Sequence, residues 1–128
     1  VLLIDVDHFK RINDAHGHAV GDQVLEHVAA VIAAQARQAD SVGRYGGDEF
    51  IIVAPQSTLA GAVQAAERLR LAMEAEHIHA RASNLRVTLS IGVAASTSED
   101  LAVADVLARA DRALYKAKAK GRNRVEAA

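Results

Sequence analysis

The stretch Arg44-Tyr45-Gly46-Gly47-Asp48-Glu49-Phe50 joins two runs that are rich in apolar residues. These runs, 42–45 and 50–54, are predicted strands, and Pro55 ends the second one. The glycine pair predicts a tight hairpin turn with positive φ angles. Two adjacent carboxylates follow the glycines, so that both backbone and carboxylates are able to approach a ligand. Mg²⁺ with a bound phosphate suits such a turn, because Mg²⁺ binds one or two carboxylates and keeps phosphate oxygens as further ligands. Taken alone, the stretch fits a solvated turn better than a ligand site.

The composition is typical of one domain in which helices pack on a sheet. Of the 128 residues, 51% are hydrophobic and only 3% aromatic, which predicts a core of Ala, Val, Leu and Ile. A formal net charge of -1 argues against binding of a nucleic-acid polymer. The absence of cysteine excludes disulfides and thiolate metal sites. Without an apolar run of membrane-spanning length, we expect a cytoplasmic domain with no membrane contact of its own; the full-length protein could still be membrane-anchored.

Residues 1–7, Val-Leu-Leu-Ile-Asp-Val-Asp, form an apolar run that ends in two acids. The run is too short for a free-standing helix and predicts a buried strand. If the strand persists to its end, Asp5 and Asp7 project from the same face. Because the chain opens inside this strand without a methionine, we expect residues 1–128 to be a single domain, truncated at its N-terminus, from a longer protein with an upstream sensor domain.

Helical spacing of apolar residues predicts three long helices in the rest of the chain. The first begins at an N-cap at Gly21-Asp22 and ends near Gln38, the second begins at Ser57 or Thr58, and the third begins at 98–100 and ends at a Gly121 C-cap. The other expected elements are a short helical turn at 10–15, a connection at 76–84, a strand at 86–93 and a short strand at 124–125.

The predicted order indicates an α+β, ferredoxin-like (βαββαβ) fold, in which helices flank a central antiparallel sheet and a C-terminal helix follows. The arrangement resembles that of nucleotide cyclases and polymerase palms. It places the first strand antiparallel to the third, so that the end of the first strand adjoins the turn at Gly46-Gly47. Asp5 and Val6 then meet Asp48 and Glu49. A divalent metal would relieve the repulsion among these carboxylates.

Basic residues are expected near these acids, because a bound phosphate needs cations. Lys10 follows the first strand, and four others crowd the end of the last helix: Lys116, Lys118, Lys120 and Arg122. Judged alone, this basic run also fits a solvated helix end that complements the helix dipole.

Five separated blocks in the right order resemble the GGDEF domain, the diguanylate cyclase family. Together they cover essentially the whole chain: Asp5-Val6-Asp7-His8-Phe9-Lys10 with Asn13-Asp14, Gly17-His18 with Gly21-Asp22, Gly46-Gly47-Asp48-Glu49-Phe50, Ala110-Asp111 with Ala113-Leu114-Tyr115, and Gly121-Arg122-Asn123. The N-terminal part of the family pattern, an Asp-x-Leu-Thr segment and a first helix, is missing from the chain. Because this part is missing, we expect the isolated fragment to be only weakly active.

The resemblance implies condensation of two GTP molecules into cyclic di-GMP with release of two pyrophosphates. Because each domain binds one GTP, catalysis implies an antiparallel homodimer. By position, Asp5, the Val6 carbonyl and Asp48 are implied ligands of two Mg²⁺ ions, with Mn²⁺ as a substitute. Lys10 is implied to stabilise charge in the transition state. Either Asp48 or Glu49 is a candidate to accept the proton.

The remaining site residues are also implied by the resemblance. The backbone of His8, Phe9 and Lys10, the glycines Gly46 and Gly47, and the side chains of Lys118 and Arg122 match phosphate contacts, and Asn13 and Asp22 match guanine contacts. The purely structural alternative is that Asn13 is a turn residue and Asp22 is an N-cap. Arg37-Gln38-Ala39-Asp40 matches the family's inhibitory Arg-x-x-Asp site for cyclic di-GMP, to which Arg68 is a weaker candidate contributor.

Two other functions compete with a cyclase that is inhibited by its product. The first is a catalytically silent module that binds GTP or cyclic di-GMP and acts as a sensor. The second is an adenylyl-type cyclase or polymerase palm on the same fold. The presence of Lys10, Asn13 and Asp22 argues against the silent module, since a site that no longer catalyses is free to lose its binding residues.

Overall fold

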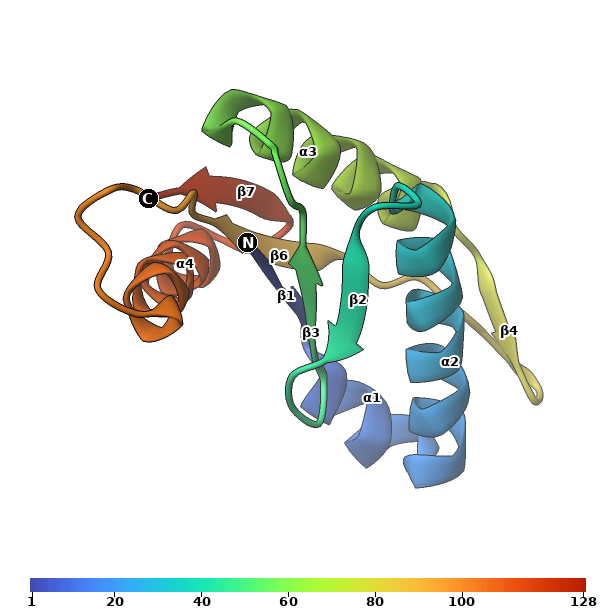
Figure 1. Cartoon of the computed structure of the whole chain (residues 1–128). Helices are drawn as coiled ribbons and strands as arrows, with labels where there is room; N and C mark the ends of the chain where they lie inside the picture. The colour runs from blue at the N-terminus through green and yellow to red at the C-terminus, as the bar shows by residue number, and fades with distance from the viewer.

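A computed structural model of the chain describes residues 1–128. Figure 1 shows a twisted sheet with helices packed around it. The elements in chain order are β1 (Leu2–Val6), α1 (Phe9–His16), α2 (His18–Gln35), β2 (Ser41–Arg44), β3 (Glu49–Val53), α3 (Leu59–Ala75), β4 (Ile78–Ala80), β5 (Ser83–Leu85), β6 (Leu89–Val93), α4 (Val103–Ala119) and β7 (Arg124–Ala127). The predicted α+β fold is confirmed. None of the helices is both long enough and apolar enough to cross a membrane.

The main sheet has the strand order β2-β3-β1-β6-β7, with β1 at its centre. As predicted, β1 is antiparallel to β3, and it is antiparallel to β6 as well. Asp5 is paired with Glu49 on one side and with Ser90 on the other. The short strand expected at 124–125 is β7, which extends to Ala127 and runs parallel to β6. This register brings the end of β1 next to the β2–β3 turn.

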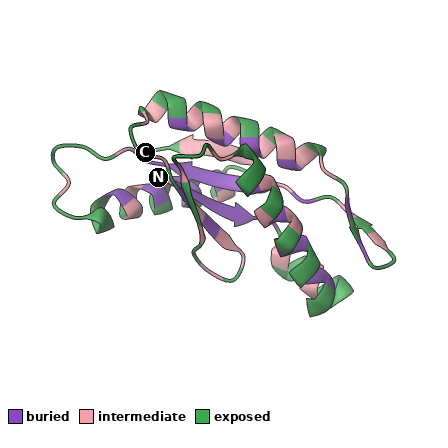
Figure 2. Ribbon diagram, turned by 45° about the vertical axis from the view of Figure 1, so that its right-hand side comes forward, coloured by how far each residue is buried: buried purple, intermediate pink, exposed green.

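The central strand is buried on both faces, which explains why its apolar residues are continuous. Leu2, Ile4 and Val6 belong to the larger core, which β1 shares with α2 and α3. Leu3 lies on the opposite face, beneath Val106, Ala110 and Leu114 of α4. Figure 2 shows the buried residues concentrated along the middle strands. Asp5 and Ser90 are therefore buried polar residues in the otherwise apolar strands β1 and β6.

Three helices begin at residues other than those predicted. Instead of a short turn at 10–15, α1 spans Phe9–His16. The second helix begins at His18, after Gly17 with φ 87°, so Asp22 is not an N-cap and lies inside α2. Helix α4 begins at Val103 rather than at 98–100, because Asp105 accepts hydrogen bonds from the amides of Leu101 (2.8 Å) and Ala102 (3.0 Å). The predicted Thr58 N-cap of α3 is confirmed, its hydroxyl accepting from the Gly61 amide at 3.0 Å.

Two further expectations about local structure are wrong. Residues 76–84 are not a plain connection, since β4 and β5 form a small hairpin there. The glycines of the β2–β3 turn do not adopt positive φ, which among glycines occurs at Gly17 and Gly121 alone. The turn closes instead through the Glu49 carbonyl, which accepts from the amides of Tyr45 (2.8 Å) and Gly46 (3.2 Å).

The loop before α4 is held by Arg109, which yields a prediction about pH. Arg109 pairs with Asp100 and donates to the Ala95 carbonyl at 2.7 Å, and the pairing lowers the pKa of Asp100 to about 2. A lowered pKa in the folded state stabilises the fold above the ordinary value of 3.8, and this contribution is lost as the pH falls toward 2. We expect Arg109→Ala to return the pKa of Asp100 toward 3.8, as measured by NMR titration of the carboxyl carbon. Arg112→Ala, at an exposed arginine without an ion pair, should leave that pKa unchanged.

Candidate functional site

The acids of β1 and of the β2–β3 turn meet at one edge of the sheet. The Val6 amide donates to the Asp48 carbonyl at 3.1 Å, which fixes the turn against the end of β1. Asp5 is only 6% exposed and forms an ion pair with Lys118 of α4. Burial raises the pKa of Asp5, the Lys118 bond opposes this effect, and the negative charges of Asp48 and Glu49 add to it. The net shift of the Asp5 pKa is upward, because burial and the neighbouring acids together outweigh the bond to Lys118.

A depression of about 380 Å³ opens over these acids. Its walls include eight of the residues that the sequence singled out: Asp5, Val6, His8, Phe9, Lys10, Asp48, Lys118 and Arg122. The predicted convergence of Asp5 with the turn is thus present. Glu49 is not among the lining residues, because its carboxylate lies against Gly46, where an added Cβ would be 2.7 Å from Oε2.

The donor set of the depression fits a magnesium ion carried by a phosphate ligand. The chain contains no group of three or more acidic, histidine or cysteine side chains able to hold a metal by themselves. Mg²⁺ in nucleotide sites needs only one or two carboxylates, because phosphate and water supply the other oxygens. The Lys118 ammonium on Asp5 stands in for such a cation. Asp5, Asp48 and the Val6 carbonyl are the groups that would hold the ion.

Arg44, at the end of β2, supports the turn, a role that the sequence pattern did not predict. Its Nε donates to the Gly46 carbonyl at 3.2 Å and its Nη2 to the Gly47 carbonyl at 2.6 Å. No sequence signal separates Arg44 from any other charged residue at a strand end. At Gly47 an added Cβ would meet nothing within 4 Å, so the fold itself leaves this backbone open.

The step from β1 to α1 presents backbone amides to the same depression. His8 adopts φ 56° and its carbonyl accepts the first bonds of α1, from Arg11 at 3.0 Å and Ile12 at 3.3 Å. The amides of Phe9 and Lys10 precede those bonds and so have no helical partner. Free amides at a helix N-terminus carry partial positive charge and suit a phosphate.

The two candidate base contacts lie on neighbouring helices. Asp22 is exposed and lines a separate depression of about 550 Å³ with Leu25, Arg44 and Phe50. Asn13 does not line that depression, but it packs against Gly21, where an added Cβ would lie 1.9 Å from Asn13 Oδ1. The same oxygen is buried and has no hydrogen-bond partner. Gly21 thus makes room for the Asn13 and Phe9 side chains of α1 against α2, and it does not mark a helix start.

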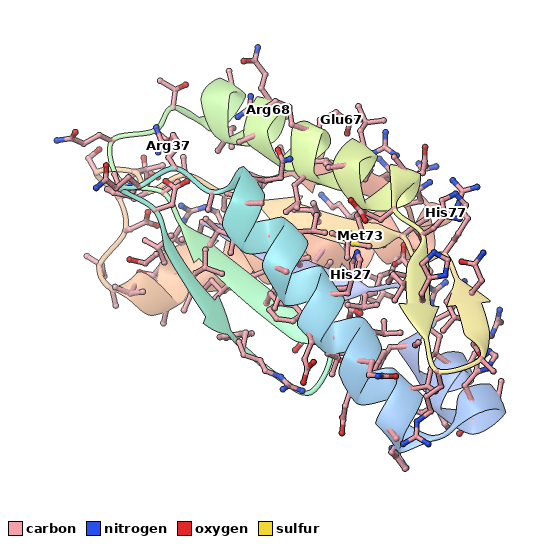
Figure 3. All side chains as sticks on the ribbon, turned by 90° about the vertical axis from the view of Figure 1, so that its right-hand side faces the viewer. His27, Arg37, Glu67, Arg68, Met73 and His77 are labelled. Carbon is pink, nitrogen blue, oxygen red and sulfur yellow. The ribbon has the colours of Figure 1, made fainter.

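Arg37 and Asp40 form a second site, far from the acids. Asp40 accepts from the Arg37 amide (2.8 Å), Nε (3.2 Å) and Nη2 (2.9 Å), and Nη2 also donates to the Ser57 hydroxyl at 2.7 Å. Both residues line a pocket of about 290 Å³ whose floor is apolar. Arg68 of α3 lines the same pocket, and Figure 3 shows it at the same end of the molecule as Arg37. The structure thus brings these three predicted residues together.

Comparison with known proteins gives the family. The model of the family described as "Diguanylate cyclase, GGDEF domain" matches residues 1–124. The chain belongs to the GGDEF family. The resemblance carried by Gly46-Gly47-Asp48-Glu49-Phe50 is therefore confirmed. This GGDEF domain is 44% identical over 125 residues to diguanylate cyclase A of Treponema denticola and 45% identical over 127 residues to the response regulator PleD of Caulobacter vibrioides.

Those relatives are much longer than the domain described here. The alignments cover 98% and 97% of this chain but 34% and 28% of the relatives. Among solved structures, the coiled coil and GGDEF domain of DgcB from Caulobacter crescentus, in complex with c-di-GMP, matches with a TM-score of 0.93 and 36% identity, over 99% of this chain and 68% of that one. The active GGEEF domain of a diguanylate cyclase from Vibrio cholerae matches with a TM-score of 0.92 and 37% identity, over 98% and 80%.

Proposed function

We propose that this GGDEF domain condenses two GTP molecules into cyclic di-GMP and two pyrophosphates. The observation that supports this most is the meeting of Asp5 and Asp48 under one depression, with a lysine ammonium already on Asp5. That arrangement provides for divalent cations beside a polyphosphate. The names of three relatives, diguanylate cyclases that share 43–44% identity with it, support the same reaction.

In the proposed reaction the chain mainly binds and orients. Asp5, Asp48 and the Val6 carbonyl would hold two Mg²⁺ ions, or Mn²⁺ in their place. When bound, these ions lower the pKa of the ribose 3′-hydroxyl and neutralise charge on the triphosphate. The Phe9 and Lys10 amides and the backbone at Gly46 and Gly47 receive phosphate oxygens. The Lys10 side chain stabilises the charge that develops during attack on the α-phosphorus.

Other residues of the site accept the 3′-hydroxyl proton and bind the terminal phosphate. Asp48 or Glu49 accepts the 3′-hydroxyl proton; Asp48 lines the depression, whereas Glu49 must turn away from Gly46 to do so. Arg122 and Lys118 would bind the γ-phosphate, and Lys118 would leave its ion pair with Asp5 to do so.

Guanine selectivity is assigned to Asn13 and Asp22. The Asp22 carboxylate accepts from N1–H and the exocyclic amine of guanine, a pattern that adenine does not offer. The unpaired Asn13 oxygen supports a role for this amide, because a buried acceptor without a partner is costly unless something from outside the chain completes it.

The reaction joins two nucleotides that are held by two domains, so we infer an antiparallel dimer. The test is formation of cyclic di-GMP from GTP and Mg²⁺ by the 128-residue chain, alone and fused at its N-terminus to a leucine zipper. We expect a rate that rises with protein concentration for the chain alone, a faster and concentration-independent rate for the fusion, and no product from ATP. Tight binding of cyclic di-GMP with no turnover in either form would favour a silent sensory module.

We further propose that Arg37, Asp40 and Arg68 bind the product and inhibit the enzyme. The Arg37 side chain is half exposed, so its guanidinium is able to reach a phosphate outside the pocket. We expect Arg37→Ala to weaken cyclic di-GMP binding by at least about tenfold, since a charge-assisted pair is lost, and to extend the linear phase of the reaction. Calorimetry and progress curves measure the two effects. Arg112→Ala is the control, because Arg112 is an exposed arginine on α4, which contributes nothing to this pocket.

A further inference from the structure

The turn between α4 and β7 has an uncommon backbone. Gly121, Arg122 and Asn123 all have positive φ, at 116°, 65° and 45°. Residues other than glycine rarely adopt this region, and two in succession require support from their surroundings. Arg122 lies in the middle of this turn and lines the depression over Asp5 and Asp48. Whatever holds the turn therefore fixes the backbone from which the Arg122 side chain extends.

Asp7 holds the turn from inside the protein. Its side chain is buried, with 5% exposure, and its Oδ2 accepts from the Asn123 amide at 3.0 Å. The hydroxyls of Thr88 and Ser90 donate to the two carboxylate oxygens at 2.7 and 2.6 Å and orient the group. Asp7 follows β1, which ends at Val6, so the condition for a shared face with Asp5 is not met and the two acids contact different partners.

Asp5 and Asp7, the two acids that flank Val6, thus bind the two ends of the segment 118–123. Asp5 pairs with Lys118 at the end of α4, and Asp7 binds the amide of Asn123, so that Arg122 lies between the two attachments. On its other side Asn123 is held by α3, where Arg70 donates to Asn123 Oδ1 at 2.9 Å and Glu74 accepts from its side-chain amide. The side chain of Asn123 is thus bound by α3, but its backbone is bound by Asp7.

We propose that Asp7 is a positioning residue for the triphosphate: it fixes the left-handed turn 121–123 and thereby places Arg122 on the terminal phosphate. The proposal rests on the proposed function, in which Arg122 is a phosphate contact. Asp7 is among the residues that line the depression, but it is buried and its two oxygens accept from Thr88, Ser90 and Asn123, so we assign it no direct contact with metal or nucleotide. Its effect should therefore depend on the phosphates beyond the first and on the presence of Arg122.

The experiment compares binding of a non-hydrolysable GTP analogue and of GMP, both with Mg²⁺, to the unsubstituted chain, Asp7→Ala, Arg122→Ala and the double variant. We expect Asp7→Ala to weaken binding of the analogue by about tenfold, because one charge-assisted contact is lost. Binding of GMP should weaken by less than about twofold. In the Arg122→Ala background, Asp7→Ala should add almost nothing, since residues that act through one contact are not additive. Equal losses for both nucleotides, or additive losses for the analogue, would overturn the proposal.

Two further measurements separate positioning from general stability. Asp7→Asn should restore most of the affinity, because an amide oxygen still accepts from the Asn123 amide while the Ser90 hydroxyl turns to accept from the new side chain. Without any nucleotide, the Asn123 amide should lose hydrogen-exchange protection in Asp7→Ala and keep it in Asp7→Asn. If Asp7→Ala does not fold, Thr88→Val, which removes one donor to Oδ2, should give a smaller loss of the same kind. No binding of the analogue by the unsubstituted chain would refute the proposed function and this inference with it, whereas binding that depends on Arg122 but not on Asp7 would refute the inference alone.

Discussion

Asp48→Ala is expected to reduce cyclic di-GMP formation by at least about a thousandfold, because catalytic metal ions supply several kcal/mol of transition-state stabilisation. Asp48 is one of only two carboxylates that line the depression and are proposed to bind metal. The loss should appear in kcat and persist at saturating GTP and Mg²⁺. Product formation by the zipper-fused chain, followed by chromatography, measures it.

The matched control is Glu99→Ala, which removes an exposed carboxylate from the loop before α4. It should leave the rate within about twofold, as is usual for surface substitutions. If Asp48→Ala retained a tenth of the activity, Asp48 would not be a metal ligand and the assignment of this depression as the catalytic centre would fail.

Gly92→Ala is expected to lower the free energy of unfolding by about 3 kcal/mol, the upper range for overpacking in a core. Gly92 lies in β6 where α4 crosses the sheet, and an added Cβ would be 2.2 Å from the Ala110 carbonyl oxygen and 2.3 Å from the Leu114 amide. Both are backbone atoms, so relief requires α4 to move away from the sheet. Because α4 carries Lys118, GTP affinity should fall together with stability.

Gly47→Ala is the matched control for this change. The same methyl group at Gly47 would meet nothing within 4 Å, and its φ is not positive, so unfolding should shift by less than about 0.5 kcal/mol. The KM for GTP should nevertheless rise, if the backbone there approaches phosphate. Chemical denaturation measures the unfolding free energy of each variant, and the KM for GTP measures its effect on binding. Together they distinguish the role of Gly92 from that of Gly47. Equal destabilisation by both would contradict the crossing described for α4.

The sequence predicted those parts of the fold that depend on a repeated pattern. The continuous apolar run of β1 and the helical stripes of α2, α3 and α4 recur over many residues, and each was assigned correctly. Helix boundaries that depend on one residue were not predicted correctly. For example, α2 begins at His18 because Gly17, with φ 87°, separates it from α1. The β4–β5 hairpin was not predicted, because its strands have three residues each, too few to show alternation of apolar and polar residues.

For the candidate site, the sequence predicted which segments meet but not how their side chains are shared. The antiparallel pairing of β1 with β3 follows from element order, and with it the approach of Asp5 to the turn at Asp48. The ion pair of Asp5 with Lys118 depends on the crossing of α4 over the sheet, and no local pattern encodes that crossing. Likewise, the left-handed backbone of Arg122 is imposed by Asp7 from more than a hundred residues away.

The Lys118–Asp5 pair gives the domain its own counter-ion. An ammonium tethered to α4 is present at high local concentration, so free Mg²⁺ should compete with it poorly. A nucleotide that arrives with its metal offers the displaced lysine a phosphate in exchange, and the two events should then occur together. The domain would thereby ignore swings in cellular magnesium and respond to the magnesium–GTP complex. Calorimetric titration of Mg²⁺ with and without a GTP analogue would reveal this synergy, and equal metal affinity in the two titrations would rule it out.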